Sequence, residues 1–215
     1  MIEDPADDSN ALQLFVRDAS PAAWLDYADE LRDCAELIWQ HHTNRIRLEY
    51  VFDSKGEGEG RMVSSVSRTY VMLTGFALEN LLKGLLVLKD STHITSGRLS
   101  PELKTHHLAQ LAAKIDKLDL TEPEANYIHV AEGAIPYWGR YPIPLSQEGL
   151  LPEVGVTEEM RETYLSLHDR LAKAVYDQVR NGWDSGAGPW LAKYRNQRYG
   201  DDIDLNEGFA LDEDG

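Results

Sequence analysis

Residues 71–88 read VMLTGFALENLLKGLLVL, and this stretch decides the fold. Its apolar side chains recur on nearly every side of a helix, which is typical of a helix buried at the centre of a domain. We therefore predict a long central helix over residues 63–90. Only Glu79, Asn80 and Lys83 interrupt its apolar surface. A charge buried there needs a partner, and Glu79 and Lys83 are four residues apart in the order that favours an ion pair.

Helix signals flank this stretch on both sides. Ser20 followed by Pro21 is typical of a helix start, because the hydroxyl caps the first turn and proline fits its first position. The residues Thr-Glu-Pro-Glu from Thr121 have the form of a capping box. Apolar side chains recur at three- and four-residue spacing behind each start, which predicts helices with one buried face. The predicted helices are residues 21–51 and 157–182, which are long, and residues 105–116 and 121–135, which are short.

The linking segments contain no persistent strand-like alternation, so no sheet is predicted. Residues 53–61, DSKGEGEGR, lack the Gly-Lys-Ser/Thr of a phosphate-binding loop and predict a flexible loop. We expect an all-α fold, an antiparallel bundle of about five helices, three long and two short. The expected organisation is an acidic flexible N-terminus at residues 1–19, the bundle at residues 20–183, and an irregular arm with an acidic tail at residues 184–215.

The net charge of −16 comes largely from the two ends of the chain. Residues 201–215 contain seven acidic residues and no Lys or Arg, and residues 1–20 contain five acidic residues against one Arg. The body is only mildly acidic, and nucleic-acid binding would require a local basic patch, which the sequence does not show. No apolar run reaches the roughly 18 residues of a membrane span, and the acidic N-terminus is unlike a secretory signal. We therefore expect a cytoplasmic protein without a membrane contact.

The sequence indicates neither a metal site nor a cofactor site. The single cysteine, Cys34, excludes an internal disulfide framework and a thiolate zinc cluster, and its place in the first long helix predicts a core position. His106 and His107 lack further ligands at a helical spacing, which favours capping and packing roles. The sequence contains no serine nucleophile elbow and no dinucleotide-binding fingerprint.

Residues 137–144, YWGRYPIP, follow the second short helix and end it, because proline removes a backbone donor. Arg140 can stack on the ring of Trp138 or Tyr141. It can also supply the counter-charge for Glu79 on the central helix, which we favour because a guanidinium fork matches a carboxylate. The same four side chains are the candidate ligand site, with a phosphate on Arg140 and a nucleotide base on an aromatic ring.

Three stretches together resemble the HEPN-like helical domains of prokaryotes, over about residues 65–182. They are GFALENLLKGLL at 75–86, HHLAQLAAKIDKLDLTEPEANYI at 106–128, and YWGRYPIP at 137–144. The resemblance is to uncharacterised bacterial members with a Gly-Arg-Tyr-Pro turn. It implies a bundle of four or five helices, frequent homodimers, and roles in defence, toxin–antitoxin and nucleotide-linked systems. The expected function is binding of a partner protein or a nucleotide.

Many members of that family cleave RNA without a metal, through an Arg followed after four to six residues by a His. The imidazole can act as a general acid or base, and the guanidinium can stabilise phosphate charge. No His follows Arg140 at that spacing, whereas six residues separate Arg161 from His168. The alternative function is therefore an endoribonuclease that uses Arg161 and His168, or Arg140 with another His, at a dimer interface. Chance alone gives about one such pair here, so both side chains facing solvent is the competing interpretation.

Overall fold

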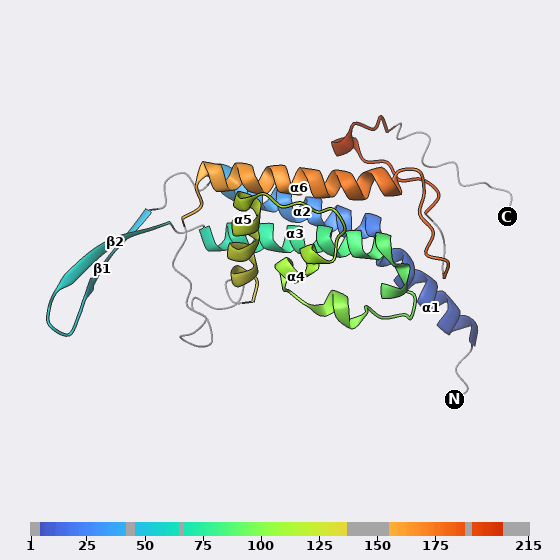
Figure 1. Ribbon diagram of the computed structural model, residues 1–215, viewed down its shortest axis with the longest axis horizontal. Coiled ribbons are helices and arrows are strands. Elements are labelled where there is room, and N and C mark those ends of the chain that lie inside the picture. The colour runs from blue at the N-terminus through green and yellow to red at the C-terminus, as the bar shows by residue number, and fades with distance from the viewer. Residues whose placement is uncertain (1–4, 42–45, 65–66, 137–154, 188–190, 204–215) are drawn as a thin grey trace.

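The computed structural model describes residues 5–41, 46–64, 67–136, 155–187 and 191–203 (Figure 1). This part of the chain is mostly helical, with six α-helices and one two-stranded sheet, so the mainly helical prediction is confirmed. Three long helices lie side by side (Figure 1). They are α2 (Pro21–His41), α3 (Ser67–Lys89) and α6 (Glu158–Val179).

The three long helices do not all alternate in direction. Glu36, near the end of α2, accepts hydrogen bonds from Tyr70 near the start of α3 and from Arg161 near the start of α6. Helices α3 and α6 therefore begin at the same end of the molecule, where α2 ends. Helix α2 runs antiparallel to α3 and to α6, but α3 and α6 run parallel to each other, which departs from the predicted antiparallel order (Figure 1).

Helix α3 is the central helix of the bundle, as predicted. It contacts α2, α4, α5 and α6, and residues such as Val71, Leu78, Leu81 and Leu82 have no exposed surface. The segment Arg68–Lys89 is long and apolar enough to cross a membrane by composition, but 72% of its apolar window is buried inside the protein, as in the core helix of a globular domain.

Helices α5 and α6 start where their capping residues predict, whereas the short helix predicted over residues 105–116 is α4, which covers only Leu108–Ala113 and begins after His107. Helix α5 (Glu122–Ala134) begins with a reciprocal capping box, in which Thr121 and Glu124 satisfy each other's backbone donors. Thr157 caps α6 by accepting from the Met160 amide. The other short elements are α4 (Leu108–Ala113) and the 3₁₀ turns η1 (Ser91–His93), η2 (Pro101–Lys104) and η4 (Gln197–Tyr199).

The prediction of a helix over residues 21–51 is wrong beyond His41. Strand β1 (Ile46–Phe52) pairs with β2 (Gly58–Ser64) in an antiparallel hairpin, with Phe52 opposite Gly58. The predicted flexible loop is thus the turn of this hairpin and most of its second strand. Asp53 orders the turn, because its carboxylate accepts from the amides of Lys55 and Glu57 at 2.8 and 2.9 Å.

The hairpin projects away from the bundle (Figure 1). Alternate side chains of β1 lie on one face, and these three are exposed: Leu48 by 60%, Tyr50 by 72% and Phe52 by 68%. The rings of Tyr50 and Phe52 lie over Gly60 and Gly58, where a side chain on either glycine would meet them. The hairpin therefore carries an apolar face that the described part of the chain does not cover.

Two further predictions about the first 41 residues are wrong. Residues 5–18 form helix α1 (Pro5–Asp18) where a flexible tail was expected, and Val16 of this helix is fully buried. The acidic composition concealed an apolar spacing that includes Leu12, Phe15 and Val16, which pack on the core. Cys34 is exposed, because it lies on the outer face of α2.

Replacing residues 46–64 with a short Gly-Ser linker is expected to shift the thermal midpoint of the monomeric chain by no more than about 2 °C, because the exposed hairpin adds little buried area to the bundle. The segment begins and ends at the same place, since Ile46 lies opposite Ser64 in the register of the hairpin. Calorimetry of the full chain provides the measurement. Leu81→Ala, which opens a cavity in α3 at a cost of about 3 kcal/mol, is the control, and an equal loss in both variants would refute the prediction.

Candidate functional site

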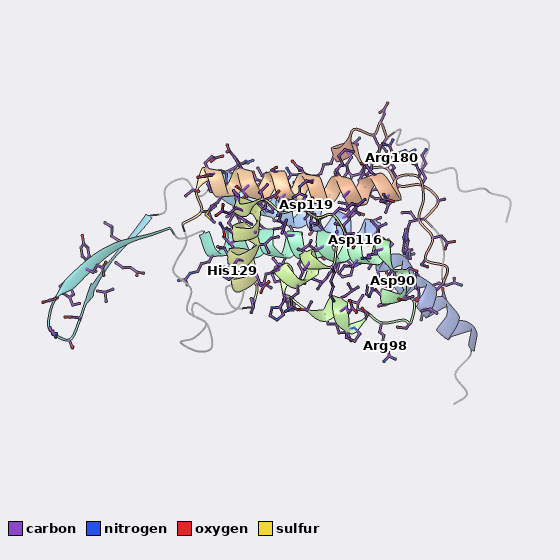
Figure 2. All side chains as sticks on the ribbon, viewed as in Figure 1. Asp90, Arg98, Asp116, Asp119, His129 and Arg180 are labelled. Carbon is purple, nitrogen blue, oxygen red and sulfur yellow. The ribbon has the colours of Figure 1, made fainter. Side chains whose placement is uncertain are left out.

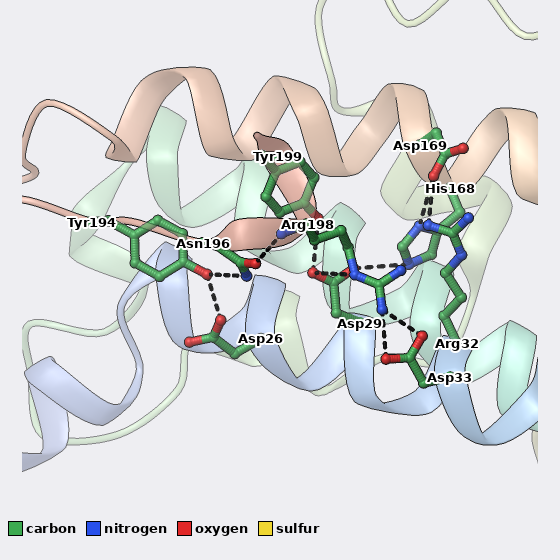
Figure 3. Close-up of polar contacts among 10 residues, drawn as sticks. All are labelled: Asp26, Asp29, Arg32, Asp33, His168, Asp169, Tyr194, Asn196, Arg198 and Tyr199. Atoms are coloured by element: carbon green, nitrogen blue, oxygen red, sulfur yellow. Dashed lines mark hydrogen bonds and ion pairs between the residues drawn. The ribbon is translucent and has the colours of Figure 1, made fainter. Parts of the chain in front are cut away.

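A polar seam runs along α2, where α6 and the C-terminal arm (residues 191–203) lie against it (Figure 3). Three aspartates of α2 share one helix face because they are three and four residues apart. Each accepts a hydrogen bond from a side chain of the arm. The pairs are Tyr194 with Asp26, Tyr199 with Asp29 at 2.8 Å, and Arg198 with Asp33. Carboxylates of α2 therefore hold the arm in place.

A glycine after α6 lets the chain turn back toward this seam. Gly182 has a φ of 106°, and a Cβ there would lie 2.9 Å from the carbonyl oxygens of Leu191 and Ala192. Trp183, which follows this glycine, and Leu191 of the arm exchange two backbone hydrogen bonds of 2.7 Å. Any side chain at residue 182 would both strain the backbone and push the arm away.

His168 lies at the base of the seam and has no exposed surface. Its Nε2 is 3.8 Å from Asp29 Oδ1, and its Nδ1 is 3.8 Å from Asp169 Oδ1 (Figure 3). Both distances exceed a hydrogen bond, so neither ring nitrogen has a hydrogen-bond partner in the described part of the chain. The ring packs edge-on against Tyr164 at 5.7 Å. A polar side chain this deeply buried without a hydrogen bond is unusual in a folded protein.

A pocket of about 480 Å³ opens above this buried layer. Four cationic side chains line it, together with two tyrosines and two aspartates. The lining residues are Arg32, Lys173, Arg180, Arg198, Tyr176, Tyr199, Asp169 and Asp177. Three of the four cations are paired with carboxylates: Arg32 with Asp169 at 2.6 Å, Lys173 with Asp177 at 2.6 Å, and Arg198 with Asp33. Arg180 is the lining cation that has no ion pair among the described residues, so the unneutralised positive charge of the pocket lies there.

Arg161 is held by carboxylates at the other end of α6. Its Nη2 donates to Glu36 at 2.5 Å and its Nη1 donates to Glu158 at 2.7 Å. Its guanidinium also lies over the ring of Trp39 at 5.5 Å. These contacts join the end of α2 to the start of α6, and they occupy the donors that would bind a phosphate.

The structure does not bring Arg161 and His168 into one exposed site. His168 is seven positions after Arg161 on α6, which places them about 10 Å apart along the helix axis. The interpretation that both face solvent is wrong for His168, which is fully buried beside Asp29. Catalysis by this pair stays a prediction, and a buried imidazole does not favour it because no substrate atom can reach the ring.

Glu79 and Lys83, which interrupt the apolar surface of α3, are buried and have partners. Glu79 is 5% exposed and Lys83 is 6% exposed. Lys83 donates to Glu79 Oε1 at 2.5 Å, and His106 places its Nδ1 2.9 Å from Oε2. Arg140, Trp138 and Tyr141 lie outside the described residues, so the predicted Glu79–Arg140 pair stays a prediction.

No group of three or more His, Cys, Asp or Glu side chains in the described ranges could hold a metal ion.

The residues that line the pocket of the seam were missed by the sequence analysis. Their one local signal is the spacing of Asp26, Asp29 and Asp33, because three acids on one helix face need cations or solvent. The partners of these acids come from the arm, more than 160 residues away, as in the ion pair of Arg198 with Asp33.

Asp29→Asn is expected to change how stability depends on pH. Burial raises the pKa of Asp29, although the hydrogen bond from Tyr199 and the charge of Arg198 oppose the shift. The folded protein therefore binds this proton more tightly than the unfolded chain does. Its stabilising contribution is lost as pH rises from about 4, the unfolded pKa, through the raised folded pKa.

The measurement is the free energy of unfolding of wild type minus that of Asp29→Asn, from denaturant titrations at several pH values. This difference should fall as pH rises through that window. Asp26→Asn removes an exposed carboxylate of the same helix and controls for the lost charge. A difference for Asp29→Asn that is independent of pH, or that rises with pH, would contradict the prediction.

Lys83→Met should destabilise the protein by about 3 kcal/mol, because it leaves the Glu79 carboxylate buried without its closest cation. The double variant Glu79→Gln, Lys83→Met should recover part of that loss, since the buried charge is gone. Denaturant titrations of the two single variants and the double variant give the coupling. Strictly additive losses would show that the two side chains do not depend on each other.

A scan against protein-family models finds no match to this chain. No curated protein and no solved structure matches it either. The geometry of the seam and of the Glu79–Lys83 pair is therefore the basis for a functional proposal.

Proposed function

We propose that this chain is a HEPN-like helical protein that acts by binding rather than by catalysis, and that it binds a nucleotide in the pocket of the polar seam. The proposed bundle of that class comprises α2 to α6, within residues 20–183. The observation that carries the proposal is a pocket in which Arg180, a cation without an ion pair among the described residues, lies beside two tyrosines.

Arg180 is the cation best placed to receive a phosphate. Its guanidinium lies over the ring of Tyr176 at 5.5 Å, and it has no carboxylate partner among the described residues. Tyr176 also stacks on Tyr199 with the ring centroids 4.6 Å apart. A guanidinium binds phosphate oxygens through several donors at once, and a tyrosine ring can stack on a base.

The binding proposal agrees better with the positions of His168 and Arg161 than the ribonuclease alternative does. An endoribonuclease needs an imidazole that reaches the scissile phosphate, whereas His168 has no exposed surface. It also needs an arginine with donors to spare, whereas Arg161 is bound by Glu36 and Glu158. RNA cleavage would then have to use Arg140 with a histidine from elsewhere.

A homodimer in the cytoplasm, a partner protein, and a role in bacterial defence or a toxin–antitoxin system also belong to this proposal. The exposed apolar face of the hairpin supports self-association. A two-stranded hairpin is only marginally stable by itself in water, and a second copy would offer the same apolar face to cover it.

Light scattering should then give a dimer for the wild type and a monomer for the double variant Tyr50→Ser, Phe52→Ser. A monomeric wild type would remove the dimer from the proposal.

Calorimetric titration of the full chain with ATP and ADP tests nucleotide binding directly. Arg180→Ala should weaken binding by about tenfold or more, since a hydrogen bond to a charged group contributes roughly 1.5–3 kcal/mol. Arg98→Ala is the matched control, because Arg98 lies at the opposite edge of the molecule from Arg180 (Figure 2). The proposal fails if neither nucleotide binds saturably, or if both variants weaken binding equally.

A further inference from the structure

A second pocket, of about 440 Å³, lies on another face of α6, between the end of α3 and the turn that leads from α4 to α5. Its lining is mixed, with aliphatic side chains from all three elements and cations among them. Ala174, which the apolar spacing predicts to be buried, is exposed and faces this pocket. The aliphatic part of the lining is Leu85, Leu88, Ile115, Leu118, Leu171 and Ala174.

The turn at this pocket contains a residue in an unfavourable backbone conformation. Lys117 has a φ of 60° and is the one non-glycine residue with a positive φ in the described part of the chain. It lies at the third position of a turn in which the Leu118 amide donates to the Ile115 carbonyl at 3.3 Å. Glycine or asparagine is favoured at such a position, because a Cβ crowds the backbone there. A lysine therefore occupies a position where glycine would make the folded protein more stable.

The cations of this pocket differ in how they are neutralised. Lys89 donates to the carbonyl of Lys114 at 3.2 Å and pairs with Asp116 at 2.9 Å, which ties the turn to α3. Arg170 donates to both oxygens of Glu124 at 2.9 Å. Lys117 has no ion-pair partner among the described residues. One positive charge without a partner thus lies beside an aliphatic surface.

We propose that this pocket is a binding site for an aliphatic carboxylate of short to medium chain length. The carboxylate pairs with Lys117, and the chain lies on Leu85, Leu88 and Leu118. Strained backbone conformations are found where function requires a particular side chain, and a lysine in place of glycine at this turn fits that rule. The site is distinct from the nucleotide pocket, because Arg170 and Gln178 face this one, whereas Asp169 and Asp177 face the other.

The test uses the full chain with sodium octanoate and 1-octanol as probes, and follows binding by calorimetry and by NMR shifts. Octanoate should bind saturably and more tightly than octanol, because only the acid has a charge for Lys117. Lys117→Met keeps the aliphatic stem and removes the charge. Lys117→Gly removes the charge and relieves the backbone. Both should weaken octanoate binding by at least about fivefold.

Thermal midpoints measure how much the backbone conformation of Lys117 costs the folded protein. Lys117→Gly should raise the midpoint by about 3 °C while Lys117→Met leaves it unchanged. Lys193→Met, in the exposed arm, should change neither the midpoint nor octanoate binding. The proposal is overturned if octanoate does not bind saturably, if octanol binds as tightly, or if the two Lys117 variants bind octanoate as the wild type does.

Discussion

Helix α3 has no polar face to present to water, and the rest of the structure follows from the need to cover it. A helix that is apolar on nearly all sides must be enclosed, because each exposed side chain forfeits the free energy of burial. Helices α2 and α6 cover it along its length, and α4 and α5 cover the remaining sides. Gly84 of α3 allows α2 to approach closely, since a Cβ there would lie 3.2 Å from the Cβ of Trp24.

Enclosure makes every polar group of α3 dependent on its neighbours. Thr74 bonds to the Tyr127 hydroxyl at 2.6 Å, which fixes α5 against α3. Glu79 is bound from its own helix by Lys83 and from outside by His106. Because an unpaired charge in such a place is costly, these contacts specify one arrangement of the short helices rather than only adding stability.

The two pockets have a common origin in the outer surface of α6. A single helix presents different faces to the arm and to the turn between α4 and α5, so it contributes charged side chains to both pockets. The buried residues below the seam differ from the core around α3, because one oxygen of Asp29 and both ring nitrogens of His168 lack a hydrogen bond. Thr74, Glu79 and Lys83 of α3 all have hydrogen bonds, whereas the ring nitrogens of His168 and the Oδ1 atom of Asp29 under the seam do not.

Local signals by themselves determined the mainly helical fold, the central place of α3 and the starts of α5 and α6, because caps and apolar spacing act within a few residues. They failed where one pattern suits two structures. Ile46 and Tyr50 are four apart, which fits a helix, yet they also alternate along β1. Only the tertiary structure decided which side chains meet. The contacts of Asp29 with Tyr199 and His168 join residues more than 130 positions apart. No local pattern in the sequence indicates such contacts, because they form only when the helices pack.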